Sequence, residues 1–267
     1  MTSDPTLAQR SLAEFLGSAL LAAIVVGSGI MATQLTSDVG VQLLINAVST
    51  AFGLTVLIVV FGPVGGAHFN PAVTLVIAAT RGLAWRDAPA YVSAQIAGCA
   101  SGAILANLMF AAPAISISET QRVAPNTLLA EVVAAAGLVL VILALVRTQR
   151  LALVAPAVGA YIGSAYFFTA STSFANPAIT LGRMLSDTFA GIAPASAPGF
   201  IAAQLVGAAI GLGLAVALYP RRVEVVEPGA AGASALATEV ESGHEAQSGA
   251  SAPARTPAVD AAPDHAG

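Results

Sequence analysis

Residues 65–73 read Gly-Gly-Ala-His-Phe-Asn-Pro-Ala-Val and residues 174–178 read Phe-Ala-Asn-Pro-Ala, so each half of the chain carries one Asn-Pro-Ala triplet. The triplets are Asn70-Pro71-Ala72 and Asn176-Pro177-Ala178. Each opens an apolar segment, about 70–80 and 176–186, that is shorter than the ~20 residues needed to cross a bilayer. Asn is a good helix cap and Pro suits the first helical position. The triplets therefore predict two half-helices that enter a membrane partway.

Six longer apolar stretches surround the triplets in the sequence. The chain has 267 residues, of which 57% are apolar and 9% charged, and its mean hydropathy is +0.83, values outside the range of ordinary soluble domains. The stretches are long enough to cross a hydrocarbon core about 30 Å thick. They run approximately over 11–33, 41–61, 88–111, 127–147, 152–170 and 197–219. The sequence thus predicts an all-α membrane protein with six transmembrane helices plus two half-helices.

The two halves of the chain repeat the same polar landmarks in the same order. Ala13-Glu14 and Ala130-Glu131 open the first and fourth spans, and the triplets follow. Span three carries Gln95, Gly98 and Gly102, and span six carries Gln204, Gly207 and Gly211 at the same spacing. Because each half has three crossings, the second half must enter from the opposite side, which predicts an inverted repeat with halves at about 11–111 and 127–220.

The chain ends and the basic residues predict an orientation. Residues 1–10 form a polar N-terminal segment, residues 11–220 the membrane domain, and residues 221–267 a disordered tail rich in Ala, Gly, Ser, Pro and Glu. With both termini in the cytoplasm, most arginines fall on the inner side and only Arg122 and Arg183 fall outside, as the positive-inside rule requires. We therefore expect a multi-pass protein of the inner (plasma) membrane.

Composition argues against other classes of protein. All ten basic residues are scattered arginines, so nucleic acid is not an expected partner, and lipid is the obvious neighbour. The single cysteine, Cys99, excludes a disulfide framework and a cysteine-based metal site. No motif for a cofactor, a metal or catalysis stands out, and we expect neither an enzyme nor a cofactor.

The half-helices predict the chemistry of a pore. Short interrupted helices of inverted repeats meet near the midplane, where each N-terminus presents roughly half a positive charge. Asn70 and Asn176 can offer side-chain N–H donors to a passing solute, so neutral oxygen-bearing solutes are favoured and cations disfavoured. His68, two residues before Asn70, has two interpretations: a pore-lining residue or a structural one.

Glu14 and Glu131 are ionisable groups within apolar spans, where they need partners. Each carboxylate could accept backbone N–H groups of the loop that leads into its half-helix, because irregular backbone inside a membrane must be satisfied internally. We favour this structural support over the alternative, a proton relay.

On these motifs the chain, over about residues 11–220, resembles the major intrinsic protein family of aquaporins and aquaglyceroporins. The resemblance implies a six-helix bundle, a homotetramer with one pore per subunit, and passive flux of water, glycerol or similar neutral solutes. Offsets from the asparagines place the family's selectivity filter at Thr50, Ser164, Ser173 and Ile179. The family ordinarily carries arginine where this chain has Ile179, and the four positions include no aromatic residue. We therefore expect a wider, uncharged filter lined by hydroxyl groups.

Two features near the second triplet concern the cargo. Arg183, one helical turn after Ile179, is predicted either in the outer vestibule or, as the favoured interpretation, in a surface ion pair with Asp187. Residues 166–191 resemble a bacterial branch associated with arsenic-resistance genes, which implies passage of arsenite or organoarsenicals besides polyols such as glycerol. The alternatives are a water-selective or general glycerol facilitator, a coupled secondary transporter, and a non-conducting adhesion or scaffold protein.

Overall fold

The computed structural model describes residues 4–220, and in this part of the chain helices are connected by loops, without strands. The predicted tail, residues 221–267, lies outside the described residues. Six helices are long and apolar enough to cross a membrane, which confirms the predicted fold class. They are α1 (Leu7–Leu35), α2 (Val39–Gly65), α4 (Ala88–Met109), α5 (Pro125–Arg147), α6 (Val154–Phe168, preceded by the 3-10 turn η1, Leu151–Leu153) and α8 (Ala197–Leu218).

The spans differ from the predicted ones mainly at their ends, and polar caps mark the beginnings of α1 and α2. Helix α1 begins at Leu7, inside the segment predicted as the polar N-terminus. Thr6 caps it in a capping box with Gln9, which satisfies N–H groups that the first helical turn leaves open. Asp38 caps α2 in a similar way, accepting the N–H of Val41 at 3.0 Å.

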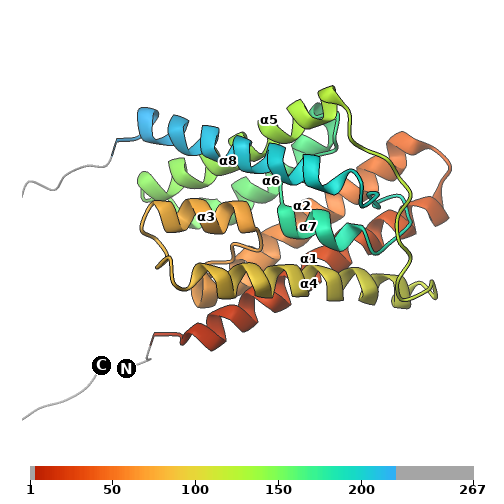
Figure 1. The fold of residues 1–267 in the computed structure, drawn as a ribbon, viewed down its shortest axis with the longest axis horizontal. Coiled ribbons are helices and arrows are strands. Elements are labelled where there is room, and N and C mark those ends of the chain that lie inside the picture. Colours follow the sequence, from red (N-terminus) through yellow and green to blue (C-terminus); the bar gives the residue numbers. More distant parts are fainter. Residues whose placement is uncertain (1–3, 221–267) are drawn as a thin grey trace, which may run out of the picture. The chain divides into compact units, whose positions relative to one another are not determined.

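Two shorter helices, α3 (Pro71–Ala79) and α7 (Pro177–Arg183), start directly after Asn70 and Asn176. Helix α7 ends three residues before the predicted boundary at 186. The reason is that the next carbonyl groups bond outside the helix: the Met184 carbonyl accepts the N–H of Ser118, and the Leu185 carbonyl accepts the N–H of Ser116. These bonds replace the next helical turn. Figure 1 shows α3 and α7 following one another along the long axis of the bundle.

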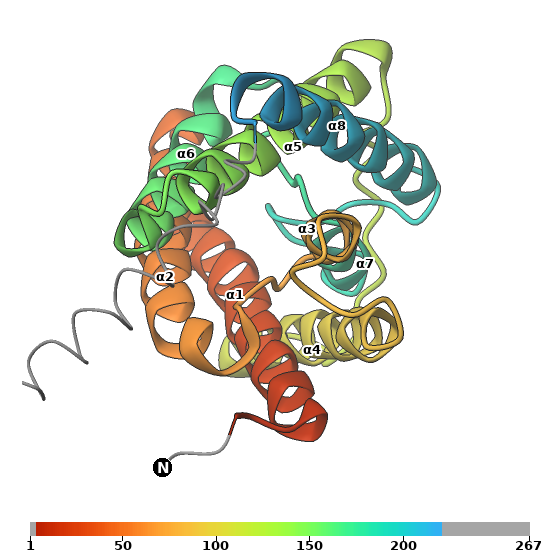
Figure 2. The ribbon, with the colours of Figure 1, turned by 90° about the vertical axis from the view of Figure 1, so that its left-hand side faces the viewer.

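The long helices form a ring that the half-helices complete. Contacts run from α4 through α1, α2, α6 and α5 to α8, and both α3 and α7 contact α4 and α8. Figure 2 looks along the bundle and shows α3 and α7 one behind the other between α4 and α8.

Backbones approach closely at equivalent places in the two halves. A Cβ atom built on Gly102 of α4 would lie 1.9 Å from the Ala19 carbonyl oxygen of α1, and one built on Gly211 of α8 would lie 2.4 Å from the Ala136 carbonyl oxygen of α5. Small residues allow this approach, which drives helix association in lipid through packing. The α1–α4 and α5–α8 pairs thus fix the outer walls against which the half-helices pack.

Candidate functional site

Asn70 and Asn176 cap the two half-helices. The Oδ1 atom of Asn70 accepts the N–H of Ala72 at 2.9 Å, and that of Asn176 accepts the N–H groups of Ala178 at 2.9 Å and Ile179 at 3.2 Å. Pro71 and Pro177 occupy the first helical positions, where a missing N–H leaves nothing unpaired. Both asparagines have extended backbone, with φ of -153° and -155°. The triplets are therefore two copies of one capped turn.

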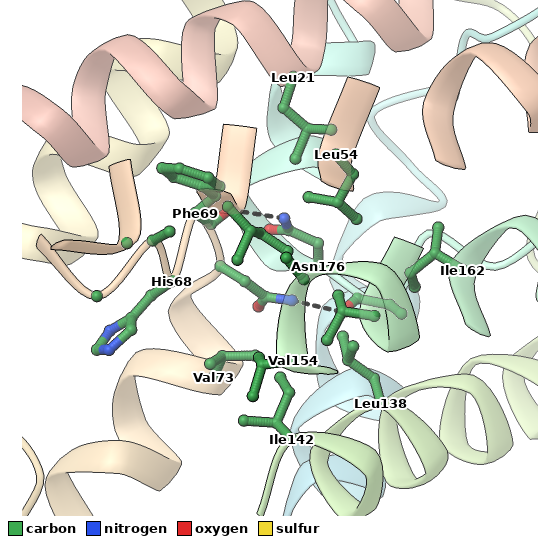
Figure 3. A pocket seen from close by; sticks show the side chains of 18 of the residues that line it. Leu21, Leu54, His68, Phe69, Val73, Leu138, Ile142, Val154, Ile162 and Asn176 are labelled. Atoms are coloured by element: carbon green, nitrogen blue, oxygen red, sulfur yellow. Dashed lines mark hydrogen bonds between the residues drawn. The ribbon is translucent and has the colours of Figure 1, made fainter. Parts of the chain in front are cut away.

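The same asparagines join the two halves of the chain. Asn70 Nδ2 donates to the Ala175 carbonyl at 2.7 Å, and Asn176 Nδ2 donates to the Phe69 carbonyl at 2.7 Å. Figure 3 draws these reciprocal bonds as dashed lines. Because each bond ends on the residue preceding the other asparagine, the two helix N-termini point toward one another, as an inverted repeat requires. Their partial positive charges meet at the middle of the bundle.

The loops that lead into the half-helices share an uncommon backbone conformation. Ala67 and Phe69 have φ of 49° and 47°, and Ser173 and Ala175, at the same offsets in the second half, have φ of 52° and 48°. Non-glycine residues in this left-handed region cost about 1 kcal/mol or more each. Such loops persist only where surrounding contacts hold them.

Two fully buried glutamates hold these loops. Glu14 accepts the N–H groups of His68 at 2.8 Å and Phe69 at 2.7 Å, and Glu131 accepts those of Phe174 at 2.9 Å and Ala175 at 2.8 Å. The carboxylates thus contact the loops as expected for structural support. Both oxygen atoms of each carboxylate accept a backbone N–H group of the loop in the same half of the chain.

The sequence did not indicate a chemical role for two glutamines that extend these networks. Gln95 Nε2 donates to Glu14 at 2.7 Å and to Thr74 at 2.8 Å. Gln204 Nε2 donates to Glu131 at 2.7 Å and to Thr180 at 2.9 Å. Their occurrence at matching positions of two apolar helices was the available signal. Each network ties two spans, a half-helix and a loop together in its half of the chain.

A cavity of about 580 Å³ runs beside the two triplets. Its wall is mainly apolar, and Figure 3 shows Leu21, Leu54, Val73, Leu138, Ile142, Val154 and Ile162 around the central amides. Its polar lining residues are Thr50, His68, Asn70, Tyr166, Ser173, Asn176 and Arg183. No aspartate or glutamate of the described chain is among the lining residues. The cavity therefore offers hydrogen-bond donors on an otherwise apolar path.

Three of the four positions predicted for the filter line this cavity: Thr50, Ser173 and Ile179. The placement of Ser164 is wrong, because its side chain is exposed on the outside of α6 and donates to the Tyr161 carbonyl at 2.8 Å. A helix turns about 100° per residue, so Ser164 lies on the face opposite the inward-facing Ile162 and Tyr166.

Tyr166 corrects the expectation that the filter region has no aromatic residue. Its side chain is 3% exposed, lines the cavity, and shares a 3.1 Å hydrogen bond with Thr50 of α2. The Ser173 hydroxyl, also in the lining, is buried without a hydrogen-bond partner among residues 4–220. An aromatic ring and a hydroxyl group without a hydrogen-bond partner are thus both part of the cavity lining.

His68 is among the residues that line the cavity. Figure 3 shows its ring pointing away from the central amides. The ring Nδ1 lies 3.1 Å from Thr74 Oγ1, and the ring packs on Tyr91 with ring centroids 5.3 Å apart. These contacts hold the ring against α3 and α4.

The predicted surface ion pair between Arg183 and Asp187 is wrong. Arg183 is 3% exposed, and within residues 4–220 the ion pairs involve Arg10, Arg86 and Asp87 only. The Asp187 carboxylate instead accepts the N–H of Glu119 at 3.1 Å. Arg183 turns inward because its guanidinium packs on the ring of Phe174, 3.5 Å from the centroid, and donates through Nε to the Ala190 carbonyl.

Six spanning helices, two opposed half-helices and a donor-lined cavity between them define a membrane channel. A family model described as "Major intrinsic protein" matches residues 1–173. The chain is 51% identical over 208 residues to aquaglyceroporin AqpS of Rhizobium meliloti (strain 1021), covering 78% of this chain and 89% of the relative. It is 38% identical over 104 residues to aquaporin NIP1-1 of Oryza sativa subsp. japonica, covering 38% and 35%. The chain belongs to the major intrinsic protein family, and it is a multi-pass membrane protein.

A solved structure supports the fold. The aquaglyceroporin from Plasmodium falciparum superposes with a TM-score of 0.62 at 20% identity, covering 84% of this chain and 98% of that one. At this level of identity the similarity concerns the fold, and the solute must be argued from the lining residues of this chain.

Proposed function

We propose that the chain is a passive channel for small uncharged solutes of the water and glycerol type. The observation that carries the proposal is the continuous cavity past both asparagines, lined by donors and free of carboxylates among the described residues. A transporter coupled through carboxylates needs them exposed to its path, whereas Glu14 and Glu131 are fully buried and each accepts several hydrogen bonds. Catalysis and a bound cofactor have no role in this proposal.

The proposed cargo extends to glycerol-like polyols, arsenite and organoarsenicals. Undissociated arsenious acid is a compact neutral molecule with hydroxyl groups, like a polyol. Thr50, Ser173 and Tyr166 offer hydroxyl groups at the cavity wall, and Ile179 adds an apolar face. This combination suits a solute that carries both hydroxyl and methyl groups. The similarity to an aquaglyceroporin supports the polyol part of the proposal.

Uptake into reconstituted vesicles tests the function. Purified protein in liposomes should speed stopped-flow equilibration of water and glycerol and radiotracer uptake of arsenite and methylarsenicals, with no effect of an uncoupler. Uncoupler-sensitive flux would instead identify a coupled transporter. Vesicles that equilibrate at the rate of empty ones would favour a scaffold or adhesion protein. A channel that passes glycerol but no arsenical would restrict the cargo to polyols.

We further propose a homotetramer in the inner membrane with both termini in the cytoplasm. The arginine distribution supports this orientation, and exposed apolar side chains on the outer faces of the helices supply surface for lipid and neighbouring subunits. Labelling of single cysteines tests the topology: Glu119→Cys, in the loop before α5, should react with an impermeant maleimide outside intact cells, and Arg150→Cys only after lysis. Cys99 is buried and is not expected to interfere.

Replacing Ile179 by arginine should narrow the channel. Ile179 is 4% exposed and lines the cavity, so a longer cationic side chain must project into the path. We expect liposome swelling by glycerol and larger polyols to fall about tenfold, which corresponds to roughly 1.4 kcal/mol of added barrier, with a smaller effect on water. Ile179→Leu is the size-matched control. An unchanged size cutoff in Ile179→Arg would contradict the filter assignment.

A further inference from the structure

Arg183 places a cation where the lining is otherwise neutral. It is the last residue of α7, one helical turn beyond Ile179, and its side chain lines the cavity although only 3% of the residue is exposed. Buried charges are normally paired, because removing a cation from water is costly. An unpaired arginine in this position therefore calls for an explanation.

Two contacts hold the guanidinium in place without neutralising it. The group packs on the ring of Phe174, 3.5 Å from the centroid, and Nε donates to the Ala190 carbonyl. Phe174 is itself fixed, because its N–H is bonded to Glu131 at 2.9 Å. Within residues 4–220 no carboxylate lies within ion-pair distance of Arg183, and its two terminal amino groups have no hydrogen-bond acceptor. A rigid cation with free donors thus remains at the cavity wall.

From this geometry we infer that Arg183 determines the specificity of the channel, by binding the oxygen atoms of neutral solutes and excluding cations. The inference rests on the proposed function. Arginine presents its donors in a fixed planar fork, suited to solutes that carry two oxygen atoms. A unit charge beside a path with apolar, low-dielectric walls repels other cations more strongly than it would in water. The charge of Arg183 adds to the partial positive charges of the two helix N-termini at the triplets.

Arg122 provides a matched control because it contacts the same aromatic ring. Its guanidinium lies 5.4 Å from the Phe174 centroid. Unlike Arg183, it donates to two backbone carbonyls, from Nε to Gly191 at 2.6 Å and from Nη2 to Phe189 at 2.9 Å, and it is not among the residues that line the cavity. Loss of Arg122 removes a half-buried cation from the loop without changing the charge at the cavity wall.

The test compares cation leak with neutral flux in the same proteoliposomes. Wild type, Arg183→Gln, Arg183→Lys and Arg122→Gln are reconstituted at equal density. Glycerol flux is followed by stopped flow, methylammonium by radiotracer uptake, and protons by a trapped pH dye under a valinomycin potassium potential. We expect Arg183→Gln to raise the methylammonium and proton leaks about tenfold or more. The methylammonium and proton leaks of Arg183→Lys and Arg122→Gln should equal those of wild type.

A double variant separates loss of charge from loss of structure. In Ile179→Arg with Arg183→Gln the cation is moved one helical turn along the cavity, so we expect the leak to return toward the wild-type value. The inference is overturned if Arg183→Gln conducts glycerol but stays tight to cations. It is also overturned if Arg183→Lys or Arg122→Gln leaks cations as fast as Arg183→Gln. The same holds if Arg183→Gln yields no folded protein while the double variant folds and leaks cations. Wild-type vesicles without glycerol flux would instead refute the proposed function itself.

Discussion

Glu131→Ala should strongly destabilise the folded channel. The substitution removes the acceptor for three buried donors: the N–H groups of Phe174 and Ala175 and the Nε2 of Gln204. Each buried donor left unpaired costs about 1–3 kcal/mol, so we expect a loss of at least ~3 kcal/mol and a fall of about 10 °C in the midpoint of thermal unfolding. Fluorescence-detected size exclusion after heating in detergent measures this midpoint.

Two further variants define what Glu131 contributes. Glu131→Gln keeps the shape and one acceptor oxygen, so its midpoint should lie between those of wild type and Glu131→Ala. Glu119→Ala removes an exposed carboxylate from a nearby loop and should change stability by less than about 0.5 kcal/mol. If Glu131→Ala unfolds at the wild-type temperature, the carboxylate does not hold the second loop.

The second large effect is expected for Gly211→Val in α8. A Cβ atom at this position would lie 2.4 Å from the Ala136 carbonyl oxygen of α5, and backbone atoms cannot move aside as side chains can. Helices α5 and α8 must then separate, and overpacking of this kind costs about 3 kcal/mol or more. We expect a large drop in folded protein and in thermal stability.

Gly213→Val is the control on the same helix. Gly213 is exposed, and a Cβ atom built there meets nothing within 4 Å among the described residues. The same chemical change two residues away should therefore leave stability close to wild type. Equal damage from both variants would mean that valine disturbs α8 itself and that the close approach to α5 is not the cause.

Much of the fold could be predicted from the sequence because the membrane imposes simple rules. A span needs a minimum apolar length, and Asn-Pro-Ala combines a good cap with a suitable first residue, so helix starts at Pro71 and Pro177 followed directly. The C-terminal ends of the helices could be predicted less well. The end of α7 depends on a loop pairing with residues 116–118, which hydropathy does not register.

The cavity lining could be predicted only in part. Counting back from Asn176 assumes a fixed path through the intervening loop, and the left-handed residues Ser173 and Ala175 change that path, so that Tyr166 and not Ser164 faces inward. Arg183 was misplaced because spacing favoured Asp187, whereas the ring of Phe174 offers a closer and less hydrated partner. Which residue of α6 faces the cavity, and which group Arg183 contacts, depend on tertiary contacts that a local sequence pattern does not reveal.

The reciprocal bonds of the two asparagines also constrain the order of events during synthesis. Asn70 precedes its acceptor at Ala175 by 105 residues, and Phe69 precedes its donor at Asn176 by 107 residues. At typical translation rates the first turn emerges roughly 5–20 s before the second. During that interval the side-chain amide of Asn70 lacks its acceptor, the Ala175 carbonyl. The first half-helix must therefore reach its final position after the second half has inserted. A ribosome stalled between the halves should therefore leave an unfinished, protease-sensitive first turn.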